Sequence, residues 1–149
     1  MSKLTLVKPH SFKAWVMAFR PKTLMAAIVP ITVGSLLPGL PYSSIDFKVM
    51  ISALIAATFL TIGTNLINDA LDFKKGADTK QRIGPMRASQ SGLLSPQLVL
   101  ASGLGALMLA FLFALPLIVK GGILFLYLTL VSMLCSYLYT GGPYPLSYK

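Results

Sequence analysis

The chain has 149 residues, of which 55% are hydrophobic and 11% are charged, and its formal net charge at pH 7 is +9. A water-soluble domain of this size carries about a quarter charged residues, so the composition excludes an ordinary soluble globular domain. The single cysteine, Cys135, and the single histidine, His10, exclude a disulfide framework and metal sites built from several such residues. We therefore expect a membrane protein.

The first 22 residues are expected to form a cytoplasmic N-terminus with a short interfacial helix. Apolar residues recur there at helical spacing, and basic residues flank them. The apolar positions are Phe12, Trp15, Val16 and Phe19, and the basic ones are Lys13, Arg20 and Lys22. An amphipathic helix with cationic flanks is typical of a segment that lies in the membrane surface.

Residues 23–149 are expected to form one polytopic, all-α transmembrane bundle with four spans. Crossing a bilayer core of about 30 Å takes about 20 helical residues. The four apolar stretches cover residues 24–40, 49–72, 98–119 and 123–139 approximately. The first stretch is short and is interrupted by Pro30 and Gly34, which membrane helices tolerate where neighbours satisfy the freed carbonyls.

Basic residues are distributed unequally about these stretches. One group lies before the first stretch, in the loop 73–97 or at the C-terminus: Lys3, Lys8, Lys13, Arg20, Lys22, Lys74, Lys75, Lys80, Arg82, Arg87 and Lys149. The other loops contain only Lys48 and Lys120. Because cytoplasmic loops carry the excess of Lys and Arg, both termini and the loop 73–97 are predicted to be cytoplasmic.

A polar stripe follows the second apolar stretch toward its cytoplasmic end. Its members are Thr58, Thr61, Asn65, Asn68, Asp69 and Asp72. The last four have i, i+3, i+4, i+7 spacing, which places them on one face of a helix. Asp78 follows shortly after Gly76, so three of the four acidic residues lie together. Acidic residues inside a membrane are costly and usually functional, and converging oxygen ligands suit Mg²⁺.

Basic residues follow this acidic cluster: Lys80, Arg82 and Arg87. Mg²⁺ prefers one or two carboxylates together with phosphate oxygens, and cationic side chains pair with phosphate. The combination predicts a magnesium–diphosphate site at the membrane surface, beside an apolar bundle that can dissolve an isoprenoid tail. Two plainer interpretations stay open. The aspartates can pair with neighbouring lysines while the amides and hydroxyls bond adjacent helices, and the basic residues can be ordinary cytoplasmic anchors.

The segment from Asn65 to Asp78 resembles the first Asp-rich motif of the UbiA superfamily of intramembrane prenyltransferases. Its form, NxxNDxxDxxxGxD, is similar to that of the branch that acts on 1,4-dihydroxy-2-naphthoate. Three further segments agree: residues 20–24 (RPKTL), residues 84–96 (GPMRASQSGLLSP) and residues 139–146 (YTGGPYPL). The 4-hydroxybenzoate branch would show Arg directly after the second Asp, where this sequence has Phe73.

The resemblance implies roles for individual residues. Asn68, Asp72 and Asp78 become catalytic residues that hold Mg²⁺ and diphosphate, and Asp69 joins the metal ligands. The implied diphosphate contacts are Arg20, Lys22, Asn65, Lys80, Arg82 and Arg87. The implied reaction moves a polyprenyl group from polyprenyl diphosphate to 1,4-dihydroxy-2-naphthoate, with loss of CO₂ and diphosphate, in menaquinone biosynthesis at a bacterial inner membrane. An apolar pocket would keep water away from the allylic cation.

Superfamily members are similar to a bundle of about nine spans with a second Asp-rich motif in the later half. This sequence has four apolar stretches and no acidic residue after Asp78. The resemblance therefore implies an N-terminal half, whose partners are a C-terminal half, the two substrates and membrane lipid, and no nucleic acid. Three alternatives stay open: a non-catalytic fragment, a prenyltransferase with another acceptor such as 4-hydroxybenzoate, and a small transporter, which gives no reason for the Asn/Asp/Gly spacing.

Overall fold

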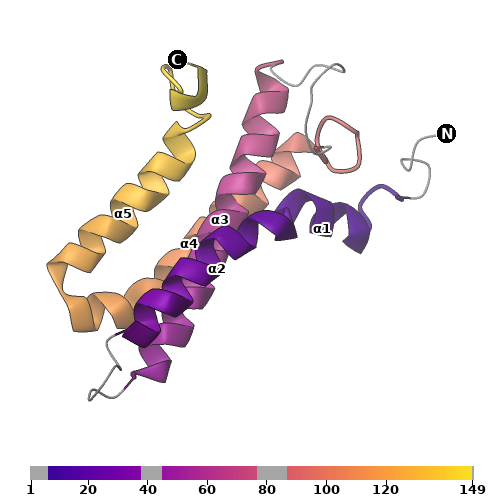
Figure 1. The fold of residues 1–149 in the computed structure, drawn as a ribbon. Helices are drawn as coiled ribbons and strands as arrows, with labels where there is room; N and C mark the ends of the chain where they lie inside the picture. Colours follow the sequence, from indigo (N-terminus) through magenta and orange to yellow (C-terminus); the bar gives the residue numbers. More distant parts are fainter. Residues whose placement is uncertain (1–6, 38–44, 77–86, 149) are drawn as a thin grey trace.

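The computed structural model describes residues 7–37, 45–76 and 87–148 (Figure 1). Within these ranges the regular structure is entirely helical, which confirms the expected all-α class. The helices are α1 (Phe12–Phe19), α2 (Pro21–Leu36), α3 (Phe47–Lys74), α4 (Pro96–Gly121) and α5 (Ile123–Leu138), followed by the 3₁₀ turn η3 (Leu146–Tyr148). The described part of the chain therefore consists of two long helices, α3 and α4, with shorter helices around them.

Short polar side chains begin three of these helices. The side chain of Ser11 accepts a hydrogen bond from the Ala14 amide at the start of α1, and that of Asp46 accepts one from Val49 at the start of α3. Ser95 caps α4 in the same way, and Pro96 occupies the first helical position. Each cap satisfies a backbone N–H that the helix leaves without an internal acceptor.

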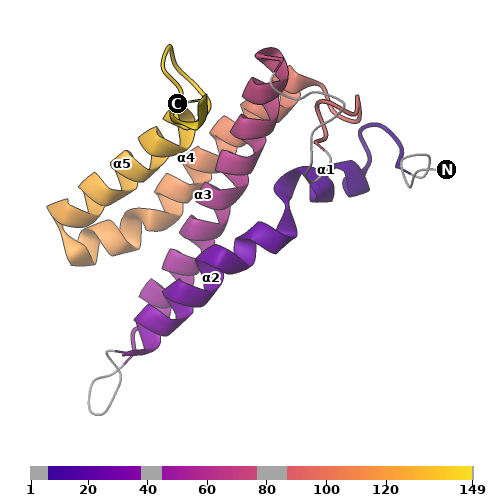
Figure 2. The same cartoon turned by 45° about the horizontal axis from the view of Figure 1, so that its top comes forward.

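Two glycines allow α3 and α4 to pack closely along the centre of the molecule. A Cβ atom added at Gly63 would lie 2.8 Å from the Leu107 side chain, and one added at Gly103 would lie 2.9 Å from the Ile67 side chain. Small residues at such crossings let membrane helices approach backbone to backbone. In Figure 2, α2 lies on the α3 side of this pair and α5 lies on the α4 side.

The α1–α2 connection is a sharp bend rather than a continuous helix. Arg20 has a positive φ of 54° at the bend, Pro21 begins α2, and the two helix axes differ by 49°. The α1 helix occurs where the sequence predicted it, but its fully buried residues are Ala14 and Ala18, while Phe12 is 82% exposed. Two alanines therefore form the fully buried face of α1, while Trp15 and Phe19 are partly buried against the same cluster.

The number of membrane-spanning helices differs from the sequence expectation. In the described part of the chain, α3 and α4 are long and apolar enough to cross a membrane, and α1 with α2 could form a third, broken span. The fourth expected stretch forms α5, which has only 16 residues because it begins after Gly122, whose φ is 69°, and ends at Leu138. At 1.5 Å per residue this helix is about 24 Å long, so four spans are not confirmed.

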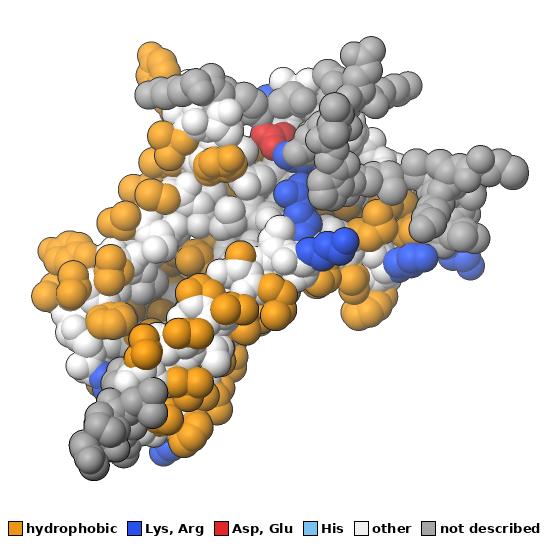
Figure 3. All heavy atoms as spheres, viewed as in Figure 1, with side chains coloured by type: hydrophobic (Ala, Val, Ile, Leu, Met, Phe, Trp, Pro, Cys, Tyr) orange, Lys and Arg blue, Asp and Glu red, His pale blue; other side chains and the backbone are white. Residues whose placement is uncertain are grey.

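Much of the described surface is apolar. Figure 3 shows hydrophobic side chains over α2 and α5, and basic side chains beside an acidic patch near the C-terminal end of α3. At the opposite end of α3, Asp46 forms an exposed ion pair with Lys120 of α4. A cavity of about 880 Å³, lined by α2, α3, α4 and α5, lies between Asp46 and the middle of α3.

Candidate functional site

The C-terminal half of α3 places four polar side chains in buried positions. Asn65, Asn68, Asp69 and Asp72 are each exposed by 9% or less. They lie on one side of the helix, as their spacing predicted, but they contact different parts of the chain. These contacts decide which side chains can meet a ligand.

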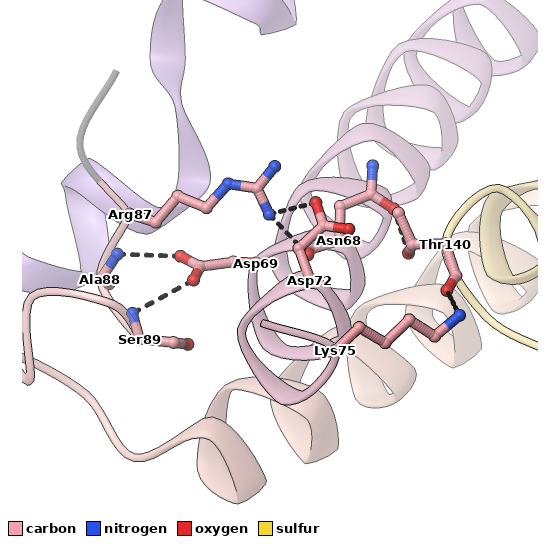
Figure 4. Close-up of polar contacts among 8 residues, drawn as sticks. All are labelled: Asn68, Asp69, Asp72, Lys75, Arg87, Ala88, Ser89 and Thr140. Carbon is pink, nitrogen blue, oxygen red and sulfur yellow. Dashed lines mark hydrogen bonds and ion pairs between the residues drawn. The ribbon is translucent and has the colours of Figure 1, made fainter. Parts of the chain in front are cut away.

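Asp69 holds the segment of residues 87–95 that precedes α4. Its two carboxylate oxygens accept hydrogen bonds from the backbone amides of Ala88, at 2.9 Å, and Ser89, at 3.1 Å. Figure 4 shows both amides pointing at the carboxylate. The segment is closed on itself by amides of Leu93 and Leu94, which donate to the Ala88 carbonyl. Asp69 is only 1% exposed, so its charge is compensated by these amides within the protein.

Asp72 pairs with Arg87, the first described residue of the same segment. The guanidinium Nη1 of Arg87 forms an ion pair with the Asp72 carboxylate and donates a 2.8 Å hydrogen bond to the backbone carbonyl of Asn68. Arg87 is 6% exposed, so the pair is nearly closed to solvent (Figure 4). The aspartate–cation pairing that the sequence left open thus occurs, and it includes an arginine 15 positions along the chain.

Asn68 contacts the segment that follows α5. Its side-chain oxygen accepts a 2.9 Å hydrogen bond from the Thr140 hydroxyl, and Lys75 Nζ donates to the Thr140 carbonyl (Figure 4). The sequence analysis gave no role to Thr140 or Lys75. The only signal for Thr140 was its place in the TGGP sequence of residues 140–143, which resembled the family but pointed to no partner.

Asn65 contacts the bend between α1 and α2. Its Nδ2 atom donates to the Phe19 carbonyl at 3.0 Å and to the Thr23 hydroxyl at 2.9 Å. The bend contains Arg20, which is partly buried, and Lys22, which is exposed in the first turn of α2. The structure therefore brings two predicted diphosphate contacts near the end of α3 through Asn65, although Asn65 itself uses its amide to hold the backbone.

Three predicted site residues, Asp78, Lys80 and Arg82, lie outside the described residues. Within the described ranges no three His, Cys, Asp or Glu residues are grouped as a metal site. The remaining oxygen donors are of the kind that a hard cation takes: the Asn68 amide and the Asp72 carboxylate lie one helical turn apart, and in this structure they contact Thr140 and Arg87. Mg²⁺ uses one or two carboxylates and completes its shell with water and phosphate oxygens.

Comparison with known proteins identifies the family. The UbiA prenyltransferase family matches residues 27–149. The chain belongs to this family. Together with the two membrane-capable helices, this identifies an integral membrane protein. No solved structure matches the chain significantly.

Several curated relatives of this UbiA-family chain are named 1,4-dihydroxy-2-naphthoate octaprenyltransferase. The protein from Bacillus subtilis is 33% identical over 129 residues, which are 87% of this chain and 41% of the relative. The one from Mycobacterium tuberculosis is 33% identical over 93% of this chain and 47% of its own length. The one from Escherichia coli is 42% identical over 85 residues, 57% of this chain. The chain thus spans less than half the length of the curated relatives it matches.

Proposed function

We propose that this chain forms the N-terminal part of an enzyme that transfers a polyprenyl group from polyprenyl diphosphate to 1,4-dihydroxy-2-naphthoate. In the proposed reaction the allylic C–O bond breaks, diphosphate leaves, a ring carbon of the acceptor forms the new C–C bond, and CO₂ is lost. The observation that supports this assignment best is the similarity to three relatives that bear this activity as their name.

The polar end of α3 supports the proposal because it contains the groups that a diphosphate requires. Asn68 and Asp72, with Asp78, would hold Mg²⁺, which when bound neutralises charge on the leaving diphosphate. Arg87 would turn part of its guanidinium toward phosphate oxygens, and Arg20, Lys22, Lys80 and Arg82 would add positive charge around them. Stabilising the departing anion is the contribution that these side chains can make to the transition state.

The cavity along α3 supports the same proposal. It is lined mainly by aliphatic side chains and alanines, from Met50 to Leu60 on α3 and from Ala110 to Leu117 on α4. From Leu60 to Asn68 the helix rises about 12 Å, so a chain whose diphosphate lies at Asn68 would extend into this cavity. An apolar enclosure would exclude water from the cationic carbon.

The membrane arrangement is also part of the proposal. We place α1–α2, α3, α4 and α5 as four spans, with both termini and the polar end of α3 in the cytoplasm of a bacterial inner membrane. The distribution of basic residues favours this orientation: Lys13, Lys22, Lys74 and Arg87 lie toward one end, and Lys48 and Lys120 lie toward the other.

The decisive assay measures product formation from a radiolabelled polyprenyl diphosphate and 1,4-dihydroxy-2-naphthoate in membranes, with and without Mg²⁺. The chain is tested alone and co-expressed with the part of the Bacillus subtilis relative that lies outside the match. We expect product only in the co-expressed sample with Mg²⁺, because one acidic cluster supplies half of the metal ligands expected for the family. Replacing the acceptor by 4-hydroxybenzoate tests the other branch, and product from that acceptor alone would refute the assignment.

A non-catalytic membrane fragment is the second candidate. It is favoured by one specific observation: the carboxylates of Asp69 and Asp72 both contact donors of the chain itself. For this candidate the co-expressed sample would form no product, and binding of the diphosphate would not depend on Mg²⁺.

A further inference from the structure

The NxxNDxxD sequence contains two interleaved pairs of residues, and the structure gives them different partners. Asn65 and Asp69 are four residues apart and contact backbone groups of flanking segments, and Asn65 also donates to the Thr23 hydroxyl. Asn68 and Asp72 are also four residues apart and contact side chains, those of Thr140 and Arg87. Residues four apart lie nearly in line along a helix, so the motif forms two adjacent rows.

We propose that Asp69 is a positioning residue that fixes Arg87 beside Asp72, and that it does not bind the metal. The inference rests on the proposed function, in which Asp72 and Arg87 meet Mg²⁺ and diphosphate. It differs from the sequence interpretation, which placed Asp69 among the metal ligands.

The hydrogen bonds of Asp69 leave it poorly suited to be a ligand. Each of its oxygens accepts one backbone N–H, and the carboxylate, Ala88 and Ser89 are exposed by only 1%, 0% and 3%. Each oxygen keeps a second lone pair, but these lone pairs are buried, so a hydrated cation would have to open the contact between Asp69 and the two amides to reach them. Asp72, by contrast, contacts a flexible arginine side chain, which also donates to the Asn68 carbonyl inside α3. If this guanidinium moves to a phosphate oxygen, no backbone N–H loses its acceptor.

The same bonds set the position of Arg87. Ala88 and Ser89 directly follow Arg87, and the segment beyond them packs Leu93 and Leu94 into the cluster with Ala14, Leu66 and Ala70. The amide of His10 donates to the Leu93 carbonyl at 2.9 Å, which joins the segment to the N-terminal region. Asp69 is therefore the point at which the segment is attached to α3 next to the arginine.

A carboxylate is needed for this attachment, which makes the proposal testable. Asn at position 69 would offer one oxygen acceptor and would place an NH₂ donor against the second amide. Asp69→Asn is thus expected to open the segment, although it has nearly the same size. Asp72→Asn removes the same charge from the same helix and serves as the matched control.

The test uses a thiol introduced by Ser89→Cys in the full chain, with Cys135→Ser to remove background labelling. Ser89 suits this purpose because its hydroxyl is buried and has no hydrogen-bond partner among the described residues. The rate of modification by a maleimide is measured in native membranes. We expect Asp69→Asn to raise this rate by at least about tenfold, the scale of a lost charged hydrogen bond, and Asp72→Asn to raise it by less than about threefold.

A second measurement compares metal dependence in the same variants. Binding of radiolabelled polyprenyl diphosphate is titrated with Mg²⁺ in the co-expressed complex. We expect Asp69→Asn to weaken diphosphate binding at saturating Mg²⁺, while the Mg²⁺ concentration for half-maximal binding stays within about twofold of that of the parent. Asp72→Asn should raise this Mg²⁺ concentration by at least about tenfold.

The outcomes separate the two ideas. If Asp69→Asn leaves the introduced thiol as protected as in the parent and shifts the Mg²⁺ midpoint like Asp72→Asn, Asp69 is a ligand and the inference is wrong. If the parent shows no Mg²⁺-dependent binding, the proposed function fails, while the thiol rates still decide the positioning role. If Asp69→Asn does not accumulate, Asp69→Glu keeps the charge and is expected to expose the thiol to an intermediate extent; full protection would refute the inference.

Discussion

Gly103→Ala is expected to destabilise the protein by forcing α3 and α4 apart. The added Cβ would lie 2.9 Å from Ile67 Cγ1, 3.1 Å from the Ile67 backbone nitrogen and 3.1 Å from Leu66 Cβ. The Ile67 side chain can rotate away, but the other two atoms are fixed to the backbone of α3. The helices must therefore separate by a few tenths of an ångström.

The magnitude follows from the cost of overpacking. Inserting a methyl group into a well-packed site costs about 1–3 kcal/mol. For a chain of this size about 1 kcal/mol corresponds to a change of about 2–4 °C in the unfolding midpoint. We therefore expect Gly103→Ala to lower the midpoint, measured by thermal aggregation in detergent, by about 3–10 °C.

Gly105→Ala is the matched control on the same helix. A Cβ at Gly105 would meet no atom within 4 Å, so this substitution changes helix propensity without adding a contact. Ala is preferred to Gly in a helix by about 1 kcal/mol, so the control should be neutral or slightly stabilising. Equal midpoints for the two variants would refute the argument that the glycine at 103 sets the helix separation.

Three further predictions concern the charged residues. Asp72→Asn should lower Mg²⁺-dependent diphosphate binding by at least about tenfold with unchanged membrane insertion, and poor insertion with normal binding would make Asp72 a purely structural residue. The hydrogen bond from Lys120 holds the pKa of Asp46 below its ordinary value of 3.8. The ion pair therefore stabilises the folded protein at pH values above 3.8, and this stabilisation is lost as the pH falls through the lower pKa of the folded state. The difference in thermal unfolding midpoint between the parent and Asp46→Asn should therefore shrink below about pH 4. A difference that persists at the lowest pH would show that it does not come from this ion pair. Cysteines placed at positions 2 and 80, with Cys135 replaced, should resist an impermeant thiol reagent added outside intact cells, and labelling of either would reverse the proposed orientation.

The helical spacing in the sequence predicted the polar row on α3 correctly, because side-chain direction along a helix follows directly from residue number. It could not predict the partners of that row. Asp69 meets amides 19 and 20 residues later, and Asn68 meets Thr140, 72 residues later. Such contacts depend on how the segments after α3 and α5 return to it, which periodicity does not encode.

The α1 helix shows a second limit of pattern reasoning. The spacing of Phe12, Trp15, Val16 and Phe19 correctly predicted a helix at this place and favoured an apolar face in the membrane surface, but it did not indicate which residues pack against the rest of the protein. In the structure Ala14 and Ala18 are buried in the cluster with Leu66 and Ala70 of α3, and Trp15 and Phe19 are partly buried against it. Where helices meet closely, steric size decides which face is buried, and a hydropathy pattern does not contain that information.

The position of the apolar cavity between α2 and α5 determines how molecules reach it. Both helices expose large apolar side chains that do not line the cavity, including Val29 and Val33 of α2 and Val131 and Leu134 of α5. Where these surfaces face acyl chains in a bilayer, a long-chain amphiphile would approach the cavity by diffusion in the plane of the membrane. Its supply then depends on its mole fraction among the lipids, and diluting the membranes with buffer would leave the occupancy of the cavity nearly unchanged.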